Sequence, residues 1–397
     1  MSVFQPANIL LPKEEISLEQ WCVVACDQYT SRPDYWEQAA KTAGNSPSTL
    51  HLVYPEALLS QGDERITSIN KTMQQYLDEG IFRELPNSLI YTERTLNNGK
   101  IRRGIVGAID LEEYDYQKGS KSKIRATEGT VLERIPPRVK IRENAPLELP
   151  HVILLIDDPD QTVIESITPG KVLYEADLMA GGGHLVGREI STEETTAFMN
   201  RFAQLEANAA DGLVIAVGDG NHSLASAKAC WEAIKPGLSP EEQLTHPARF
   251  CLAELENIHD PSQEFEPIHR AVFGVNPEEF LQKFTTLPQV SDCGEGEKVI
   301  CLYQGNTVEL YLKDTPLAVG LLQKFLDEQD CEIDYIHGAD EVKRLSAEQG
   351  NVGFLLPKPG KSELFCTVIQ DGALPRKTFS MGEANEKRFY MEAKRIK

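Results

Sequence analysis

Four polar residues stand close together at one glycine-containing turn, and their side chains are of kinds that handle phosphate. They are Asp219, Asn221, His222 and Ser223, within residues 213–231. A carboxylate can bind Mg²⁺, and a neutral imidazole can hydrogen-bond a phosphate or accept a proton. The sequence therefore predicts a site for a phosphorylated ligand at this turn. Asp219 is its expected metal ligand, and Asp219 and His222 are its expected catalytic groups.

The residues on either side of the turn predict a strand followed by a helix. Residues 213–217 form an apolar, β-branched run typical of a buried strand, and Gly218 and Gly220 interrupt it. Asn221 is a favourable helix N-cap. One apolar stripe then recurs at helical spacing, made of Leu224, Ala227, Trp231 and Ile234. Because the N-terminus of a helix attracts anions, Gly220, Asn221 and Ser223 are expected to bind phosphate or nucleotide.

The same turn resembles the Asp-Gly-His-His-Arg signature of a family of uncharacterised proteins, domain of unknown function 1015. Further matches to that family follow in order along the chain: Arg125-Ala-Thr-Glu-Gly-Thr130, Glu266-Pro-Ile-His-Arg270, Tyr335-Ile-His-Gly-Ala-Asp-Glu341 and Leu374-Pro-Arg-Lys-Thr-Phe379. Because these matches span nearly the whole chain, it is identified as a member of that family.

The signature is also similar to that of the ParB/sulfiredoxin-like fold, which includes kinases that phosphorylate free serine with a nucleotide. Two positions depart from the signature: Asn221 replaces the first His, and Ser223 replaces the Arg. The missing Arg removes a bidentate phosphate partner. The serine-kinase resemblance implies a glutamate, upstream of the histidine loop, that acts as the general base. Glu128 lies upstream of His222 and is the candidate for that role.

Two other matched segments supply further candidates for binding phosphate or nucleotide. Thr127 and Thr130 flank Glu128 and offer hydroxyl groups. His269 and Arg270 form a second group, in which Arg270 could replace the arginine lost from the turn.

A third group of candidates is the basic pair Arg376 and Lys377, near the C-terminus of an acidic chain. Asp157 and Asp158 end an apolar run and offer an alternative metal pair, although Asp-Pro is also a common turn. A flexible turn is the favoured interpretation of the glycines at 181–183.

The overall composition limits the classes of partner. The chain has 397 residues and a formal net charge of −21, which opposes binding to nucleic acid and to anionic membranes. We see no signal peptide, and the longest apolar runs are too short to span a bilayer. The eight cysteines are scattered, which indicates reduced thiols. We therefore expect a cytoplasmic protein without nucleic-acid or membrane partners, while its oligomeric state stays open.

The order of elements predicts an α+β fold with a central mixed β-sheet flanked by helices. The expected helices cover residues 31–43, 62–80 and 191–208. The expected strands cover residues 21–25, 88–96, 100–111 and 152–156. Asn97-Asn98-Gly99 joins two of these strands in a hairpin.

A smaller C-terminal α/β part is expected to follow, with a hairpin at 299–312 and helices near 315–329, 339–349 and 361–371. We divide the chain into an N-terminal α/β region, a central region with the candidate site and a C-terminal α/β region. Their ranges are 1–116, 117–265 and 266–397.

The function indicated is a phosphotransferase that uses ATP or ADP with Mg²⁺ and acts on a small hydroxy compound, with free serine as the favoured acceptor. Glu128 would deprotonate the hydroxyl, and Arg270 and the 219–223 turn would hold the phosphates. One alternative is a metal-dependent phosphoester hydrolase built on Asp157, Asp158, Asp219 and His222. Another is a nucleotide- or metabolite-sensing protein without turnover.

Overall fold

The computed structural model describes residues 2–30, 32–130, 132–315, 317–375 and 377–397. The described chain forms two compact units. Unit 1 comprises Met1–Ala126, Thr130–Gln263 and Glu383–Lys397, and unit 2 comprises Thr127–Gly129 and Glu264–Gly382. Among the described residues, no helix combines the length and the apolar character needed to cross a bilayer.

Unit 1 is built on a mixed ten-stranded sheet with the order β10-β11-β4-β5-β13-β9-β12-β7-β6, in which β1 also pairs with β5. Most neighbours are antiparallel, whereas the pairs β13–β9, β12–β7 and β6–β7 are parallel. The strands are β1 (Phe4–Gln5), β4 (Ile90–Thr95), β5 (Ile101–Asp110), β6 (Tyr114–Asp115), β7 (Ile124–Ala126), β9 (Ile153–Ile156), β10 (Val172–Leu178), β11 (Gly183–Glu189), β12 (Ile215–Asp219) and β13 (Phe250–Asn257).

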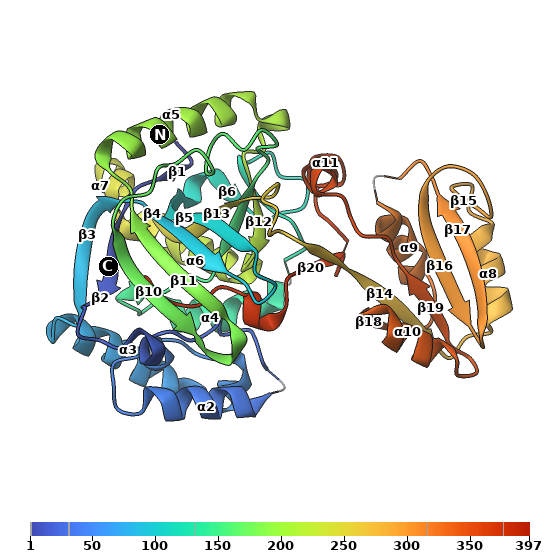
Figure 1. The fold of residues 1–397 in the computed structure, drawn as a ribbon, viewed down its shortest axis with the longest axis horizontal. Coiled ribbons are helices and arrows are strands. Elements are labelled where there is room, and N and C mark those ends of the chain that lie inside the picture. Colours follow the sequence, from blue (N-terminus) through green and yellow to red (C-terminus); the bar gives the residue numbers. More distant parts are fainter. Residues whose placement is uncertain (1, 31, 131, 316, 376) are drawn as a thin grey trace. The chain divides into compact units, whose positions relative to one another are not determined.

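Helices cover both faces of this sheet (Figure 1). The helices of unit 1 are α1 (Leu18–Trp21), α2 (Pro33–Ala43), α3 (Gly62–Asp78), α4 (Ile135–Arg142), α5 (Thr192–Asn208), α6 (Asn221–Ile234) and α7 (Pro240–Thr245). Two further strand pairs complete the unit: β2 (Ala7–Pro12) with β3 (Phe82–Ser88), and β8 (Leu147–Glu148) with β21 (Lys394–Arg395).

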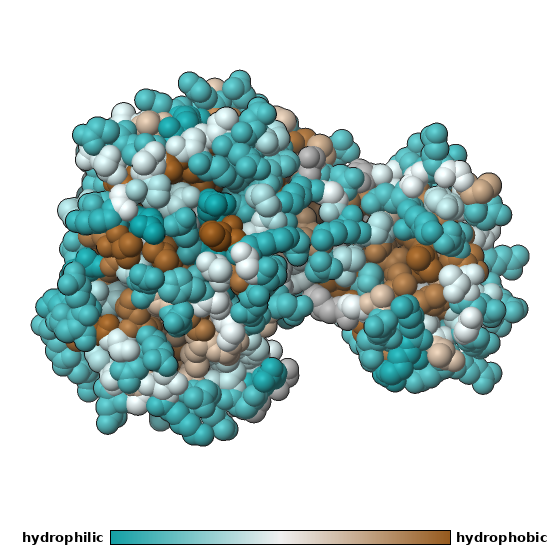
Figure 2. Space-filling model, viewed as in Figure 1, coloured by the Kyte–Doolittle hydropathy of each residue, from teal (hydrophilic) through white to brown (hydrophobic). Residues whose placement is uncertain are grey.

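Side chains that point alternately to the two faces of β5 contribute to both apolar clusters of unit 1. Ile105 and Ile109 join the apolar cluster under α5 and α6, whereas Val106 and Ala108 join the cluster under α2 and α3. Successive side chains of a strand point to opposite faces, so one apolar strand fills two cores. The visible surface is mainly hydrophilic, interrupted by smaller apolar areas (Figure 2).

Unit 2 is a second α+β body with its own sheet, of order β15-β17-β16-β19-β14-β18 and with β20 paired to β14. Its strands are β14 (Phe265–Phe273), β15 (Val290–Ser291), β16 (Glu297–Tyr303), β17 (Asn306–Leu312), β18 (Glu332–His337), β19 (Val352–Leu355) and β20 (Phe379–Met381). Its helices are α8 (Pro277–Thr285), α9 (Ala318–Asp327), α10 (Ala339–Ser346) and α11 (Lys361–Asp371).

The predicted α+β class, with a mixed sheet flanked by helices, is confirmed, as are the hairpin at 97–99 and the helices at 31–43, 62–80 and 191–208. The strand expected at 21–25 is wrong. Helix α1 ends at Trp21, and Val24 makes only an isolated bridge, to Phe389. An apolar run alone does not distinguish a strand from a buried coil segment.

The predicted division of the chain differs from the two units. Residues 1–116 and 117–265 share one sheet, because β5 pairs with β13 along seven residues, so no boundary between compact units falls at 116. The expected C-terminal region, residues 266–397, is also divided between the two units. Glu264–Gly382 forms most of unit 2, whereas Glu383–Lys397 returns to unit 1, where β21 pairs with β8.

Candidate functional site

The candidate site starts at the junction of β12 and α6. β12 runs to Asp219, two residues beyond the expected strand, and Gly220 is the N-cap of α6 with a φ of 82°. A Cβ at this glycine would lie 3.1 Å from the Cα of Val152, and a positive φ disfavours other residues. Asn221 is therefore the first helical residue and not the predicted N-cap.

Packing of α6 fixes the direction of its first turn. Leu224, Ala227 and Trp231 of the predicted stripe are buried in the core under the helix, and Ile234 packs at its margin. The first three N–H groups of a helix have no carbonyl partner within that helix. The turn that carries His222 and Ser223 thus presents backbone donors at the positive end of the helix dipole.

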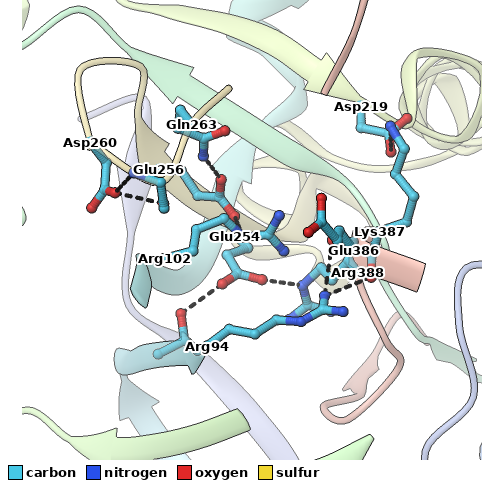
Figure 3. Close-up of polar contacts among 12 residues, drawn as sticks. Arg94, Arg102, Asp219, Glu254, Glu256, Asp260, Gln263, Glu386, Lys387 and Arg388 are labelled. Atoms are coloured by element: carbon cyan, nitrogen blue, oxygen red, sulfur yellow. Dashed lines mark hydrogen bonds and ion pairs between the residues drawn. The ribbon is translucent and has the colours of Figure 1, made fainter. Parts of the chain in front are cut away.

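Asp219 forms an ion pair with a lysine from the far end of the sequence. Asp219 Oδ2 lies 3.4 Å from Lys387 Nζ, and both side chains are largely buried (Figure 3). Asp219 Oδ1 accepts a hydrogen bond of 2.9 Å from the N–H of Gly220. The Asp219 carboxylate therefore stabilises the turn and holds the Lys387 ammonium group beside it.

Arg94 fixes the segment that carries Lys387. Its guanidinium donates hydrogen bonds to the carbonyl oxygens of Gly182, Asn385, Glu386 and Lys387. Burial lowers the pKa of Arg94 to about 9, because the charge is removed from water, and the charge of Arg102 lowers it further. Since these donors reach both the β10–β11 turn and residues 385–387, they hold the backbone at Lys387 in place.

Arg388, the residue after Lys387, is anchored in a buried charge network. It donates to Glu254 Oε2 at 2.7 Å and to Glu392 Oε2 at 2.6 Å, and it also reaches the carbonyl of Pro150. Figure 3 shows Glu254 between Arg102 and Arg388. The network therefore fixes two segments: the C-terminal segment that carries Lys387 and, through the Pro150 carbonyl, the backbone that directly precedes His151.

Asp27 is a second carboxylate near the site that the sequence analysis missed. Burial opposes its ionisation, but the charges of His151 and Lys387 and a hydrogen bond of 3.1 Å from Gln28 together lower its pKa below the ordinary range. Asp27 is therefore ionised at neutral pH and acts electrostatically on the same lysine as Asp219. No motif marked it, because its neighbours in sequence are ordinary turn residues.

His222 is half-buried, and its pKa is lowered. Burial is the main cause, and the positive charges of Arg138 and Arg134 add to it, whereas Asp27 opposes them. The imidazole is therefore neutral at pH 7, as a proton acceptor must be. These two arginines, from α4 and the turn before it, place positive charge near His222, and Arg138 also pairs with Glu56.

A cavity of about 170 Å³ lies in unit 1 next to the first turn of α6. Ser223, Arg138 and His151 are among its lining residues, most of which are apolar. The side-chain oxygens of Thr130 and Asn221 are buried in unit 1 without a hydrogen-bond partner among the described residues. Such atoms are costly unless they bind water or a ligand.

Five predicted site residues that the structure describes belong to unit 2: Thr127, Glu128, His269, Lys377 and Arg270. Thr127 is buried and its carbonyl accepts a hydrogen bond of 2.7 Å from the N–H of Leu374, to which Glu128 also forms a bridge. His269 Nδ1 accepts from the N–H of Leu356 at 3.1 Å. Lys377 is exposed, with a φ of 54°. Arg376 lies outside the described residues.

Arg270, the fifth, is fully buried in unit 2. Its Nε donates to Gln323 at 2.9 Å and its terminal nitrogen donates to the carbonyl of Ile268 at 2.6 Å, while the guanidinium lies 4.6 Å from the centre of the Tyr335 ring. These contacts are those of a structural arginine inside unit 2.

The other candidates of the sequence analysis have structural contacts. Asp158 is buried and accepts from the N–H groups of Thr162 and Val163, both at 2.7 Å, so it closes a turn. Asp157 pairs with His259 at 2.6 Å. Among the described residues, no group of three or more His, Cys, Asp or Glu is arranged to hold a metal ion. A metal at Asp219 would therefore need ligands from its substrate, as Mg²⁺ often does.

The fold and the site define a class: an α+β protein with a strand–turn–helix junction that gathers cationic groups around backbone donors. The chain belongs to the family described as "Protein of unknown function (DUF1015)", whose model matches residues 5–329. No curated protein sequence matches the chain.

Several solved structures are similar to this chain. SbnI with a C-terminal truncation, from Staphylococcus aureus, is 12% identical, with 72% of this chain and 82% of that chain covered and a TM-score of 0.37. A mutant of free serine kinase in complex with AMP is 11% identical, with 72% and 93% covered and a TM-score of 0.39. The non-mutated kinase with AMP is 12% identical, with the same coverage and a TM-score of 0.38. A free serine kinase is thus among the similar structures, as the turn suggested. No site residue is transferred from it at this level of likeness.

Proposed function

We propose that the protein is a cytoplasmic phosphotransferase that moves a phosphoryl group from ATP or ADP to a small hydroxy compound, with free serine as the favoured acceptor. The observation that supports this most is the set of charges at the first turn of α6. Lys387, Arg138 and Arg134 bring positive charge, and Asp219 and Asp27 bring carboxylates for a metal ion or a proton.

Each group has a role in such a transfer. The N–H groups of the turn, Lys387 and Arg138 would bind the phosphates, and Asp219 would contribute one ligand to Mg²⁺. The bond between the terminal phosphorus and its bridging oxygen breaks, and the acceptor oxygen bonds to that phosphorus. The hydroxyl proton passes to His222, which is neutral at pH 7. Positioning and charge stabilisation would supply most of the acceleration.

The assignment of Glu128 as general base stays a sequence prediction, as do the phosphate contacts of Thr127, Thr130, His269, Arg376 and Lys377. The mechanism above uses residues of unit 1 alone. Arg138 takes the role first expected of Arg270, because Arg138 lines the cavity beside the turn, where it also pairs with Glu56, whereas Arg270 is fully buried inside unit 2.

Nucleotide binding is the first test. Calorimetric titration with ATP, ADP, CTP, pyrophosphate and phosphate, each with and without Mg²⁺, should show binding that both Asp219→Ala and His222→Ala weaken. Phosphoserine formation from serine is then followed by ³¹P NMR, beside a panel of other small alcohols. Nucleotide binding that is unaffected by both substitutions would reject the site.

The alternative functions predict other outcomes. Metal-dependent phosphoester hydrolysis without a nucleotide would favour the hydrolase, although Asp158 is engaged in its turn. Tight nucleotide binding without transfer to any acceptor would favour the sensing protein. Duplex DNA is expected not to bind at physiological salt, because the net charge of −21 opposes phosphate contacts.

A further inference from the structure

A serine and a histidine are paired at the wall of the unit 1 cavity. Ser223 Oγ lies 3.1 Å from His151 Nε2, and His151 Nδ1 lies 2.8 Å from the hydroxyl oxygen of Tyr390. A nucleophile, a base and a group that orients the base form the arrangement that activates serine in covalent catalysis. These three residues come from separate parts of the chain. The phosphoryl transfer proposed above uses backbone N–H groups of the same turn but none of these three side chains.

Tyr390 contacts His151 on the side of the ring away from Ser223. The Tyr390 oxygen accepts a hydrogen bond of 3.1 Å from the N–H of Cys26 and lies 2.8 Å from His151 Nδ1. When the proton of His151 is on Nδ1 and is donated to the Tyr390 oxygen, Nε2 presents its lone pair to the Ser223 hydroxyl, as a general base must.

The surroundings favour the charges that such a reaction creates. Asp27 is ionised and close enough to His151 for their charges to interact, so it would stabilise an imidazolium. Ser223 lies in the first turn of α6, whose backbone N–H groups have no partner within the helix and would be available to an oxyanion. His151 is only 5% exposed, which keeps the pair out of bulk water.

The cavity provides a binding site for an apolar group beside the serine. Leu52, Val53, Met73 and Ile141 contribute to its lining together with Ser223 and His151. Its volume is about 170 Å³. Since an apolar cavity of about 150 Å³ takes up benzene, this one has room for a single aromatic ring or a short branched chain.

We propose that Ser223 and His151 form a serine esterase site for carboxylic esters with a small apolar acyl group. Ser223 Oγ attacks the carbonyl carbon, and its proton passes to His151 Nε2. The carbon–oxygen bond to the leaving alcohol breaks, and His151 returns the proton to that oxygen. Water, deprotonated by His151, then attacks the acyl-serine, releasing the acid and restoring Ser223. Tyr390 is a positioning residue. This activity is separate from phosphoryl transfer.

The test uses the full chain with a fluorophosphonate probe and with p-nitrophenyl butyrate, benzoate and palmitate. Intact-mass analysis should show one probe per chain, and peptide mapping should place it on Ser223 and not on Ser226, one turn further along α6. The butyrate or benzoate ester should be hydrolysed and the palmitate ester, too long for the cavity, should not. Ser223→Ala and His151→Gln should each lower kcat/KM by about 10²–10⁴-fold.

Tyr390→Phe separates a positioning role from a merely structural one. It removes the acceptor of His151 Nδ1–H, so we expect a lower kcat with little change in KM and a shifted pH profile. The exposed serine of α3, in Ser68→Ala, is the control and should react normally. Absence of probe labelling in folded wild-type protein, or ester hydrolysis that persists in Ser223→Ala, would overturn the proposal. Neither result bears on nucleotide binding, which is measured separately.

Discussion

Lys387 Nζ lies 3.4 Å from Asp219 Oδ2 at the end of β12, although the two residues are far apart in sequence. Both side chains are largely buried, so each charge depends on its partner for stabilisation. A nucleotide with Mg²⁺ would offer each partner a new counter-charge, phosphate oxygens to Lys387 and the metal to Asp219. The ion pair thus joins the positive and negative halves of the proposed site.

The first prediction concerns Lys387. Lys387→Gln should weaken ATP binding by about 10- to 100-fold, because hydrogen bonds to charged groups contribute about 1.5–3 kcal/mol. The measurement is calorimetric titration at fixed ionic strength. Lys171→Gln, which removes an exposed lysine paired with Glu189 at 3.5 Å, is the matched control and should bind ATP normally. Equal affinities in wild type and Lys387→Gln would place the phosphates elsewhere.

The second prediction concerns Arg94, which holds the backbone at Lys387. Arg94→Gln should lower the free energy of unfolding by about 3 kcal/mol or more, because several buried carbonyls lose their donor. Urea unfolding measures this loss, and faster amide exchange near residues 385–387 should accompany it.

Arg32→Gln is the control for Arg94. It removes an exposed ion pair with Asp34, at 2.9 Å, and should leave the free energy of unfolding nearly unchanged. A similar, small loss in both variants would contradict the anchoring role of Arg94.

The third prediction concerns the titration of His222. NMR should show a pKa below the ordinary value of about 6.5, since burial and two arginines oppose the cation. Arg138→Gln should raise that pKa, because one positive charge is lost.

This lowered pKa also has a consequence for stability. The unfolded chain binds the proton more readily than the folded chain, so stability is present above pH 6.5 and falls as the pH drops toward the folded pKa. Replacement of His222 by Gln should flatten the change of unfolding free energy with pH below 6.5. An unaltered pH dependence in His222→Gln would refute the assignment.

The fourth prediction tests His222 against two carboxylates, Glu128 and Asp27, as the base of phosphoryl transfer. If Glu128 is the base, as the sequence suggests, Glu128→Gln should lower turnover by about 10²–10⁴-fold while nucleotide binding is nearly intact. Asp27→Asn would lower turnover in the same way if Asp27, the carboxylate in unit 1, is the base instead. Phosphoserine formation by ³¹P NMR compares the two variants with wild type. Full turnover in both would leave His222 as the proton acceptor.

Local sequence patterns determined much of the fold. The stripe from Leu224 to Ile234 predicted α6, and Asn97-Asn98-Gly99 predicted the β4–β5 hairpin, because both signals arise between neighbours in sequence. The polar group from Asp219 to Ser223 was also visible, since one turn holds all of it. The prediction of Asn221 as the N-cap was wrong for a local reason too. The N-cap position has a positive φ, which Gly220 adopts more easily than asparagine does.

The tertiary structure alone decided which distant groups join that turn. Lys387 reaches Asp219 because the C-terminal segment returns to unit 1, and Asp27, Arg138 and His151 arrive on three other segments. Hydrophobic periodicity shows which face of an element is buried, but it does not show which element covers that face. The partners of a polar residue depend on long-range packing, and so the chain's own sequence near residue 219 could not reveal them.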